Sequence, residues 1–443
     1  MTPADLKKEA GKGPYKGIAR SQIIRLKIAD KKEFTLNNGA KIKGTNWDEK
    51  TYTLFVGTRK ISLKEIKKDP DFGGGGSGAG ADVTAIVECG QALVCSLIYN
   101  VIKKEIKWED LTYDGLQKAM QYCDLSETFD TIIERSPPEW VQSYVKSANI
   151  LYRNYKMLGT PVYFHRGSKF MNEVYSGKKI VFDADKKSDR PQAPGSFSDD
   201  KWNPGDIWMT TLKTVPTIST DSWSSLNKDI YDLARAKKLV GVSLKKVGAS
   251  AHIEEYNALS AKQTKEYRYA SFRVTSASER GPLPPFFNSI DLYMSIGDRE
   301  VQFRATSGEA SWQGEIKGAT AAGGKIGGGN VNFYLKKYVG KGLFDKSEDE
   351  VLKFVKTKDF FNEFYALYKK HFDGKILPYE EFVMNANNKQ KESKGYLFSK
   401  YMNMKFIDIF LSANTATRNK IATDFVRYAA SNTDQSSFFV KIS

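Results

Sequence analysis

Two charged side chains in the middle of the chain have the types and the spacing to act on a phosphodiester bond. Asp206 stands at the start of an apolar segment, after Pro204-Gly205, and Lys245 follows the apolar segment Leu239–Leu244 about forty residues later. An aspartate carboxylate supplies the oxygen ligands that Mg²⁺ prefers, and the bound metal polarises a scissile phosphate. A lysine beside it orients or deprotonates the attacking water and offsets charge in the transition state.

Asp206 and Lys245 can act together only if neighbouring strands of one sheet place them side by side. The apolar segments 206–211 and 239–244 are predicted to be strands, and the pattern between them predicts a helix over 227–238. Because side chains alternate along a strand, Ser243 and Lys245 would share one face, while Leu244 would offer its carbonyl oxygen to the metal. The centre of the chain is therefore predicted to be α/β, with a mixed sheet flanked by helices.

These residues resemble the two motif elements of the PD-(D/E)XK nuclease superfamily, whose core is a four-stranded mixed sheet flanked by helices. Pro204-Gly205-Asp206 matches the first element with one inserted glycine, and Ser243-Leu244-Lys245 matches the second with serine in place of a carboxylate. The resemblance implies a Mg²⁺ or Mn²⁺ cofactor, DNA as the substrate, and catalytic roles for Asp206, Lys245 and Ser243. It extends over about residues 82–320 in architecture.

The same resemblance points to further acidic residues. Many members of the superfamily carry a glutamate on the helix before the sheet, and Glu88 matches that role as a catalytic residue and metal ligand. The long interval from Glu88 to Asp206 then requires a helical insertion. Glu254 or Glu255 is expected to supply the carboxylate that Ser243 lacks, and Glu255 is the expected metal ligand.

A second acid-x-lysine pair lies downstream and is an alternative catalytic site. Glu315-Ile316-Lys317 is a fuller match to the dyad, with Asp291 or Asp298 as its upstream partner. The segment that follows, 318–330, is rich in glycine, whose backbone N–H groups can approach a phosphate closely. The expected nucleic-acid-binding residues are Lys325 in this segment and Lys246 beside the first site.

Composition favours a polyanionic partner. The net charge is +16 and the isoelectric point is about 9.3, a balance common in nucleic-acid-binding proteins. Cys89, Cys95 and Cys123 are too few for a disulfide framework and favour a reducing compartment. The absence of CxxC and HExxH patterns argues against a zinc site of the usual spacing.

Four regions are predicted along the chain. Short alternating segments predict a small SH3-like β-barrel within residues 1–72, and a glycine-rich linker follows over 73–81. Residues 82–335 form the predicted nuclease-like core with its helical insertion, and 336–443 a helical C-terminal region. The apolar stretch from Val83 to Val101 carries Glu88 and is predicted to be a buried helix. No membrane span and no secretory signal are expected.

The chain also resembles a tailed-bacteriophage protein in the segments 202–208, 313–318 and 434–441. That resemblance implies a location in the host cytoplasm or in a virion, with viral assembly partners. Three functions therefore remain open: a metal-dependent DNA nuclease, a non-catalytic DNA-binding or virion structural protein on a nuclease-like fold, and an ADP-ribosyl or other transferase. The last has no convincing cofactor loop in the sequence.

Overall fold

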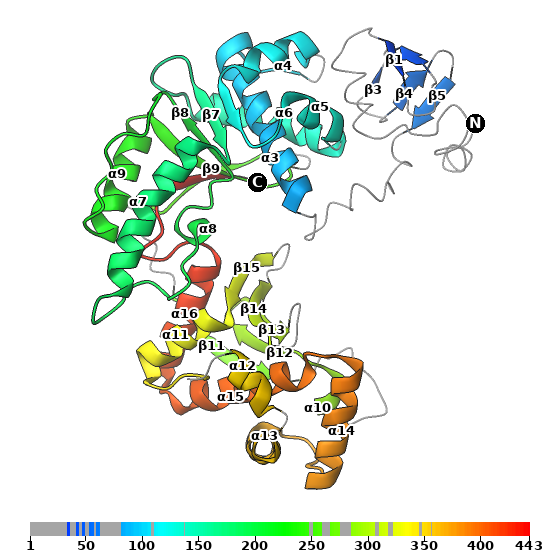
Figure 1. Ribbon diagram of the computed structural model, residues 1–443, viewed down its shortest axis with the longest axis vertical. Coiled ribbons are helices and arrows are strands. Elements are labelled where there is room, and N and C mark those ends of the chain that lie inside the picture. The colour runs from blue at the N-terminus through cyan, green and yellow to red at the C-terminus, as the bar shows by residue number, and fades with distance from the viewer. Residues whose placement is uncertain are drawn as a thin grey trace. The chain divides into compact units, whose positions relative to one another are not determined.

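A computed structural model shows two compact units (Figure 1). The first comprises residues 1–181, 203–261 and 437–443, and the second comprises residues 182–202 and 262–436. The structure describes five short strands within residues 33–62, and then residues 81–107, 110–136, 138–247, 251–258, 266–274, 285–305, 310–317, 322–344, 348–355 and 357–443.

The first unit is built on a six-stranded mixed sheet. Across the sheet, its strands are β10 (Ile253–Tyr256), β16 (Phe439–Ile442), β9 (Leu239–Leu244), β8 (Ile207–Thr210), β7 (Tyr163–Arg166) and β6 (Cys123–Leu125). Strand β8 runs antiparallel to both β7 and β9, whereas β16 runs parallel to β9. The expected mixed sheet flanked by helices is confirmed, and β9 has the predicted bounds.

Helices cover both faces of this sheet (Figure 1). On one face lie α3 (Ala81–Ser96), which continues as a π-helix over Leu97–Ile102, and α6 (Pro138–Asn154). On the other lie α7 (Lys169–Lys186) and α9 (Trp223–Arg235). The smaller helices α4 (Tyr113–Met120) and α5 (Phe129–Arg135) complete the helical region before β7.

The segment Thr84–Ile102 is the central core helix of the first unit. It is long and apolar enough to span a membrane by composition, and 72% of its apolar window is buried within the structure. Cys89, Leu93 and Leu97 are fully or almost fully buried and belong to one apolar cluster with strand residues such as Phe164 and Val242. The prediction of a buried helix is confirmed, and Glu88 is carried on its first half.

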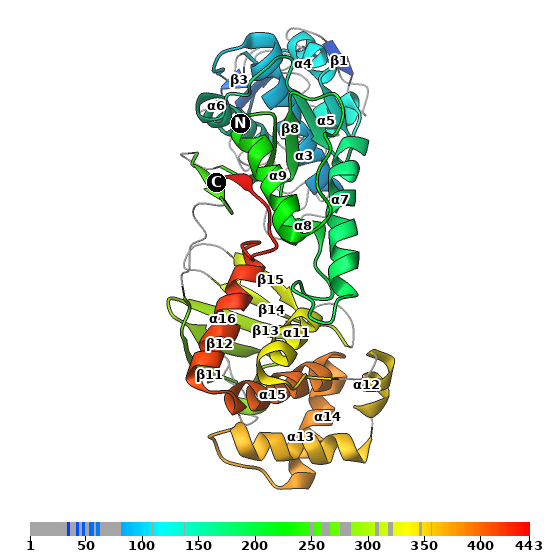
Figure 2. The ribbon, with the colours of Figure 1, turned by 90° about the vertical axis from the view of Figure 1, so that its left-hand side faces the viewer.

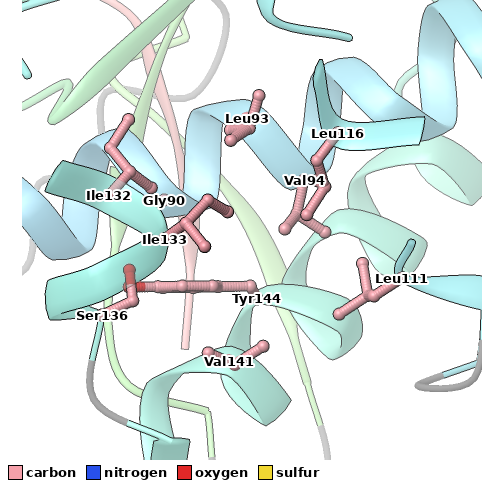
Figure 3. Close-up of a pocket in the computed structure, with 10 residues that line it drawn as sticks. All are labelled: Gly90, Leu93, Val94, Leu111, Leu116, Ile132, Ile133, Ser136, Val141 and Tyr144. Atoms are coloured by element: carbon pink, nitrogen blue, oxygen red, sulfur yellow. The ribbon is translucent and has the colours of Figure 1, made fainter. Parts of the chain in front are cut away.

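A small apolar cavity lies where α3 meets α4, α5 and α6 (Figure 3). Its walls are mainly aliphatic, with Leu93, Val94 and Ile133 around the ring of Tyr144. No carboxylate, amine or imidazole lines it among the described residues. The cavity is therefore a largely apolar gap in the packing of these helices, with the Ser136 and Tyr144 hydroxyls as its polar groups.

The second unit contains its own five-stranded antiparallel sheet (Figure 2). Its strands, in order, are β11 (Tyr269–Arg273), β12 (Leu292–Ile296), β13 (Arg299–Ala305), β14 (Trp312–Lys317) and β15 (Ala322–Gly327). The helices after it are α11 (Gly328–Val339), α12 (Glu348–Phe354), α13 (Lys358–His371), α14 (Tyr379–Glu392), α15 (Tyr396–Ser412) and α16 (Thr415–Ala429). The helical C-terminal region is thus confirmed.

The division into units differs from the predicted one, which joined residues 82–335 in a single core. Residues 262–335 group with the C-terminal helices because their strands pair with one another and bury aromatic side chains against α15 and α16. The Phe303 ring, for example, lies 4.7 Å from the Phe406 ring, centroid to centroid. The chain then returns to the first unit through β16.

The N-terminal region holds two small sheets. Strand β1 (Glu33–Thr35) pairs with β2 (Lys41–Lys43), and β3 (Trp47–Asp48), β4 (Thr53–Val56) and β5 (Arg59–Ser62) form a three-stranded sheet. The closed SH3-like barrel and the glycine-rich linker rest on residues outside the described part of the chain, so both stay predictions.

Candidate active site

A buried asparagine fixes the turn that carries Asp206. The Asn203 side-chain oxygen accepts a hydrogen bond from the Gly205 N–H at 3.0 Å. The Asn203 amide donates to the Ser437 hydroxyl and to the Phe438 carbonyl at 2.8 and 2.9 Å. Because Asn203 is 1% exposed, these three bonds are made without competition from bulk water. The turn is therefore attached to the segment that leads into β16.

The glycine inserted between Pro204 and Asp206 has a steric reason. A Cβ at Gly205 would lie 2.9 Å from the Gly241 Cα, and one at Gly241 would lie 2.5 Å from the Asn203 side-chain oxygen. The turn and strand β9 thus approach more closely than two side-chain-bearing residues allow. This contact sets Asp206 against the far end of β9.

Asp206 and Lys245 come together because β8 and β9 are antiparallel. Ile207 pairs with Val242, so the start of β8 lies beside the end of β9. The Asp206 carboxylate accepts a hydrogen bond from the Leu244 N–H, one residue before Lys245. The Lys245 N–H donates to the Ile442 carbonyl at 2.9 Å, so β16 holds the lysine's backbone. Asp206 directly precedes β8 and Lys245 directly follows β9, so the two residues flank adjacent strands.

Glu88 reaches this end of the sheet from α3. Its side chain is 14% exposed and accepts a hydrogen bond from the Arg166 Nε at 2.7 Å. Burial, and next the negative charge of Asp206, raise the pKa of Glu88 to about 7, although Arg166 and Lys245 pull the pKa down. Glu88, Arg166, Asp206 and Lys245 thus lie at the same end of the sheet, close enough for their charges to act on Glu88. Helix α3, the start of β8 and the end of β9 each supply one residue predicted for the site: Glu88, Asp206 and Lys245.

Arg166 is the member of the site that sequence reasoning missed. It is the last residue of β7, and its guanidinium is 25% exposed beside the Glu88 carboxylate. The signal was an arginine at the end of an apolar strand, directly before a glycine at φ +64°. Its strand lies next to β8, but nothing in the local pattern indicates a partner 78 residues earlier on α3.

The donor set fits a hard divalent cation with few protein ligands. Among the described residues, no three His, Cys, Asp or Glu side chains are grouped closely enough to hold a metal ion by themselves. Mg²⁺ commonly takes one or two carboxylates and completes its shell with water and substrate phosphate. The charge of Asp206 raises the pKa of Glu88, and a cation between the two carboxylates would relieve that repulsion.

Two further residues expected near this site, Ser243 and Lys246, lie on β9 or shortly after it. Ser243 is 4% exposed, pairs with Lys441 on β16, and by strand alternation shares a face with Lys245. Its catalytic role stays a prediction. Lys246 extends over the Trp140 ring, with its Nζ 5.6 Å from the centroid.

Glu255 lies on β10, and β16 separates that strand from β9. Glu255 pairs with Val440 across this boundary, and its carboxylate lies 3.8 Å from Arg235. Neighbouring strands are about 4.8 Å apart, so Glu255 stands two strands away from Lys245 and three from Asp206. The expectation that Glu255 completes the metal site is not supported by this placement.

The downstream dyad is an ion-pair cluster in the second unit. The Glu315 carboxylate lies 2.9 Å from both Arg304 and Lys317, and Lys325 pairs with Glu315 on the neighbouring strand. Part of the glycine-rich segment is strand β15, where a Cβ at Gly324 would lie 2.0 Å from the Ala429 carbonyl oxygen. That glycine serves close packing of β15 on α16.

The raised pKa of Glu88 predicts an unusual pH dependence of stability. A carboxyl group whose pKa is higher in the folded than in the unfolded state stabilises the protein below its unfolded pKa, 4.5, and that contribution is lost as the pH rises through about 7. The difference corresponds to about 3 kcal/mol. In urea denaturation with EDTA, wild type should lose about this much more free energy of unfolding than Glu88→Gln between pH 4.5 and pH 8.

Glu105→Gln is the matched control for this measurement. Glu105 also pairs with an arginine, Arg153, at 2.6 Å, but on an exposed surface where the hydrogen bond lowers its pKa. Its substitution should leave the wild-type pH profile unchanged over the same range. Parallel profiles for wild type and Glu88→Gln would contradict the electrostatic account of the site.

No family model, no curated protein and no solved structure matches this chain.

Proposed function

We propose that this chain is a metal-dependent nuclease that hydrolyses phosphodiester bonds of DNA. The observation that supports the proposal most strongly is the convergence of Glu88, Asp206 and Lys245 at one end of a mixed sheet. Each comes from the type of element that the nuclease resemblance assigns to it. The net charge of +16 agrees with a polyanionic substrate.

Each residue of the site has a distinct proposed role. Asp206 and Glu88 would hold Mg²⁺ or Mn²⁺, which when bound supplies Lewis-acid polarisation of the phosphate. The Leu244 N–H fixes one Asp206 oxygen, so the carboxylate is oriented before substrate arrives. Lys245 orients the attacking water and offsets negative charge in the transition state. Arg166 is a positioning residue that holds the Glu88 side chain.

A non-catalytic DNA-binding or virion structural protein is the second candidate. Two observations favour it: Ser243 stands where the superfamily has a carboxylate, and Arg166 already neutralises Glu88. In this case the nuclease fold would be retained without a bound metal. A location in the host cytoplasm or a virion, with viral assembly partners, belongs to either proposal.

Incubation of plasmid DNA with the full chain tests the two against each other. Wild type is expected to nick or linearise the plasmid in 5–10 mM Mg²⁺ or Mn²⁺, about the working range for a weakly held Mg²⁺ ion, and to leave it intact in EDTA. With protein in excess, so that all plasmid is bound, Glu315→Gln should cleave at the wild-type rate, because Glu315 belongs to the separate ion-pair cluster. Binding without cleavage of any DNA or RNA would favour the structural protein. Loss of cleavage in Glu315→Gln would move the site to the downstream dyad.

A further inference from the structure

The second sheet has one face packed on helices and one polar face. Leu292, Met294 and Ile296 on β12 are fully buried, and Tyr293 and Ser295 between them are half-buried. The buried row faces α15 and α16, because the Phe303 ring lies 4.7 Å from the Phe406 ring on α15 and 6.2 Å from the Phe425 ring on α16, centroid to centroid. The opposite row we call the outer face. Among the described helices, α15 and α16 cover the face that carries the buried row, which we call the inner face.

The strand registers place charged side chains together on the outer face. Pairing relates Arg273 to Tyr293, Gln302 to Tyr293 and to Glu315, and Glu315 to Lys325. Residues two apart on one strand share a face, which adds Glu300 and Arg304 on β13 and Lys317 on β14. Among the described residues, the charged members of the outer face are four basic residues and three acidic ones: Arg273, Arg304, Lys317, Lys325, Asp291, Glu300 and Glu315.

Glu315 is a buried anchor for the basic groups. Its side chain is 10% exposed, whereas those of Arg304 and Lys317 are 42% and 39% exposed. Burial alone would raise the Glu315 pKa, but the hydrogen bond from Lys317 and the charges of Lys317, Arg304 and Lys325 lower it below the usual 4.5. The carboxylate thus stays ionised in the buried part of the cluster, and the cations that bond to it lie nearer the solvent. Three positive charges surround one negative charge that solvent scarcely reaches.

Planar side chains lie beside these charges. The Arg273 guanidinium carbon is 4.1 Å from the centre of the Tyr293 ring, and one Arg273 nitrogen donates to Glu300 at 3.0 Å. The Gln302 amide donates to Asp291 and to the Tyr293 hydroxyl, which fixes the ring from its polar end. A held aromatic ring and a guanidinium plane are the groups on which unpaired bases stack.

We propose that the outer face of the second sheet binds single-stranded nucleic acid, with Arg304, Lys317 and Lys325 contacting its phosphates. The basic residues extend from β11 to β15, four strand intervals or about 19 Å, a span that suits a strand lying across the sheet. A flat face admits unpaired bases, whereas reading a duplex requires a helix or ribbon that enters a groove. The proposal does not depend on the nuclease chemistry of the first unit.

Fluorescence anisotropy with labelled (dT)20 tests the proposal in the full chain, with EDTA present so that no cleavage occurs. Lys325 is exposed at the margin of the cluster, so Lys325→Glu should fold normally. Loss of one phosphate contact should weaken binding about fivefold at 0.1 M salt and reduce the slope of log K against log salt by about 0.7. Lys353→Glu on α12 makes the same charge change on an exposed helix and should shift affinity less than twofold, about the level of non-specific electrostatics.

Glu315→Gln gives a test of opposite sign. Removal of the anchoring charge frees three cations for phosphate, so affinity should increase. Glu381→Gln, at an exposed position on α14, should not reproduce the increase. Thermal melts verify folding, and if Glu315→Gln unfolds, the two lysine variants decide. Equal weakening by Lys325→Glu and Lys353→Glu, or equal affinity of Glu315→Gln and Glu381→Gln, would overturn the proposal. Tighter binding of a 20-base-pair duplex with the same dependence on Lys325 would replace the single strand by a duplex.

Discussion

Asp206→Asn is expected to reduce metal-dependent DNA cleavage by at least about 10³-fold while the protein stays folded. Asparagine retains an oxygen that can accept the Leu244 N–H hydrogen bond, so the turn and strand β9 stay joined. What is lost is the negative charge, and with it the metal ligand. DNA binding in EDTA should be unchanged or slightly tighter, because a carboxylate that repels phosphate has been removed.

The same variant has a readout that does not depend on activity. Asp206 raises the pKa of Glu88, so removing its charge should lower that pKa from about 7 and flatten the pH dependence of stability. Lys245→Ala should reduce the cleavage rate by about 10²-fold, as for other positioned charge-stabilising groups. Cleavage by Asp206→Asn at the wild-type rate, in protein freed of contaminating nuclease, would refute the assignment of this site.

The second large effect is expected at Asn203, on stability. Asn203→Ala removes a fully enclosed amide and leaves the Gly205 N–H and the Phe438 carbonyl without the partners that Asn203 provides. Each buried unsatisfied group costs about 1–3 kcal/mol, so the free energy of unfolding should fall by about 3 kcal/mol or more. Urea denaturation measures the loss. Cleavage should fall further than the unfolded fraction explains, because the turn that carries Asp206 loosens.

Asn154→Ala is the matched control. Asn154 also donates its amide to a backbone carbonyl, that of Ile150 at 2.8 Å, but it does so at an exposed position on α6 where water replaces the lost bond. Its cost should stay near 0.5 kcal/mol, about the usual value for surface substitutions. Similar losses for the two variants would show that the Asn203 bonds do not hold the turn.

Much of the site could be predicted from local sequence. The apolar run at 239–244, bounded by Lys238 and Lys245, has the length and composition of a buried strand, and the structure gives β9 these bounds. The apolar helix around Glu88 was recognised for the same reason. Local patterns define elements because the period of apolar residues follows from backbone geometry.

The remaining features depend on contacts that are distant in sequence. Strand β16 inserts between β9 and β10 from almost 200 residues downstream, and that insertion separates Glu255 from the site. Alternation of side chains along a strand does not indicate which sheet the strand joins. Arg166 faces Glu88 only because α3 crosses β7 in the folded unit. Such pairings are set by tertiary packing and leave no local signal.

The position of β16 in the chain also orders events during synthesis. A ribosome completes the whole second unit before it reaches residues 437–443, the segment that accepts the Lys245 N–H bond and anchors the turn of Asp206. Nascent or prematurely terminated chains therefore contain every charged residue of the site but lack the strand that aligns them. In such chains the Lys245 N–H and the Asn203 amide lack the bonds that residues 437–443 make to them.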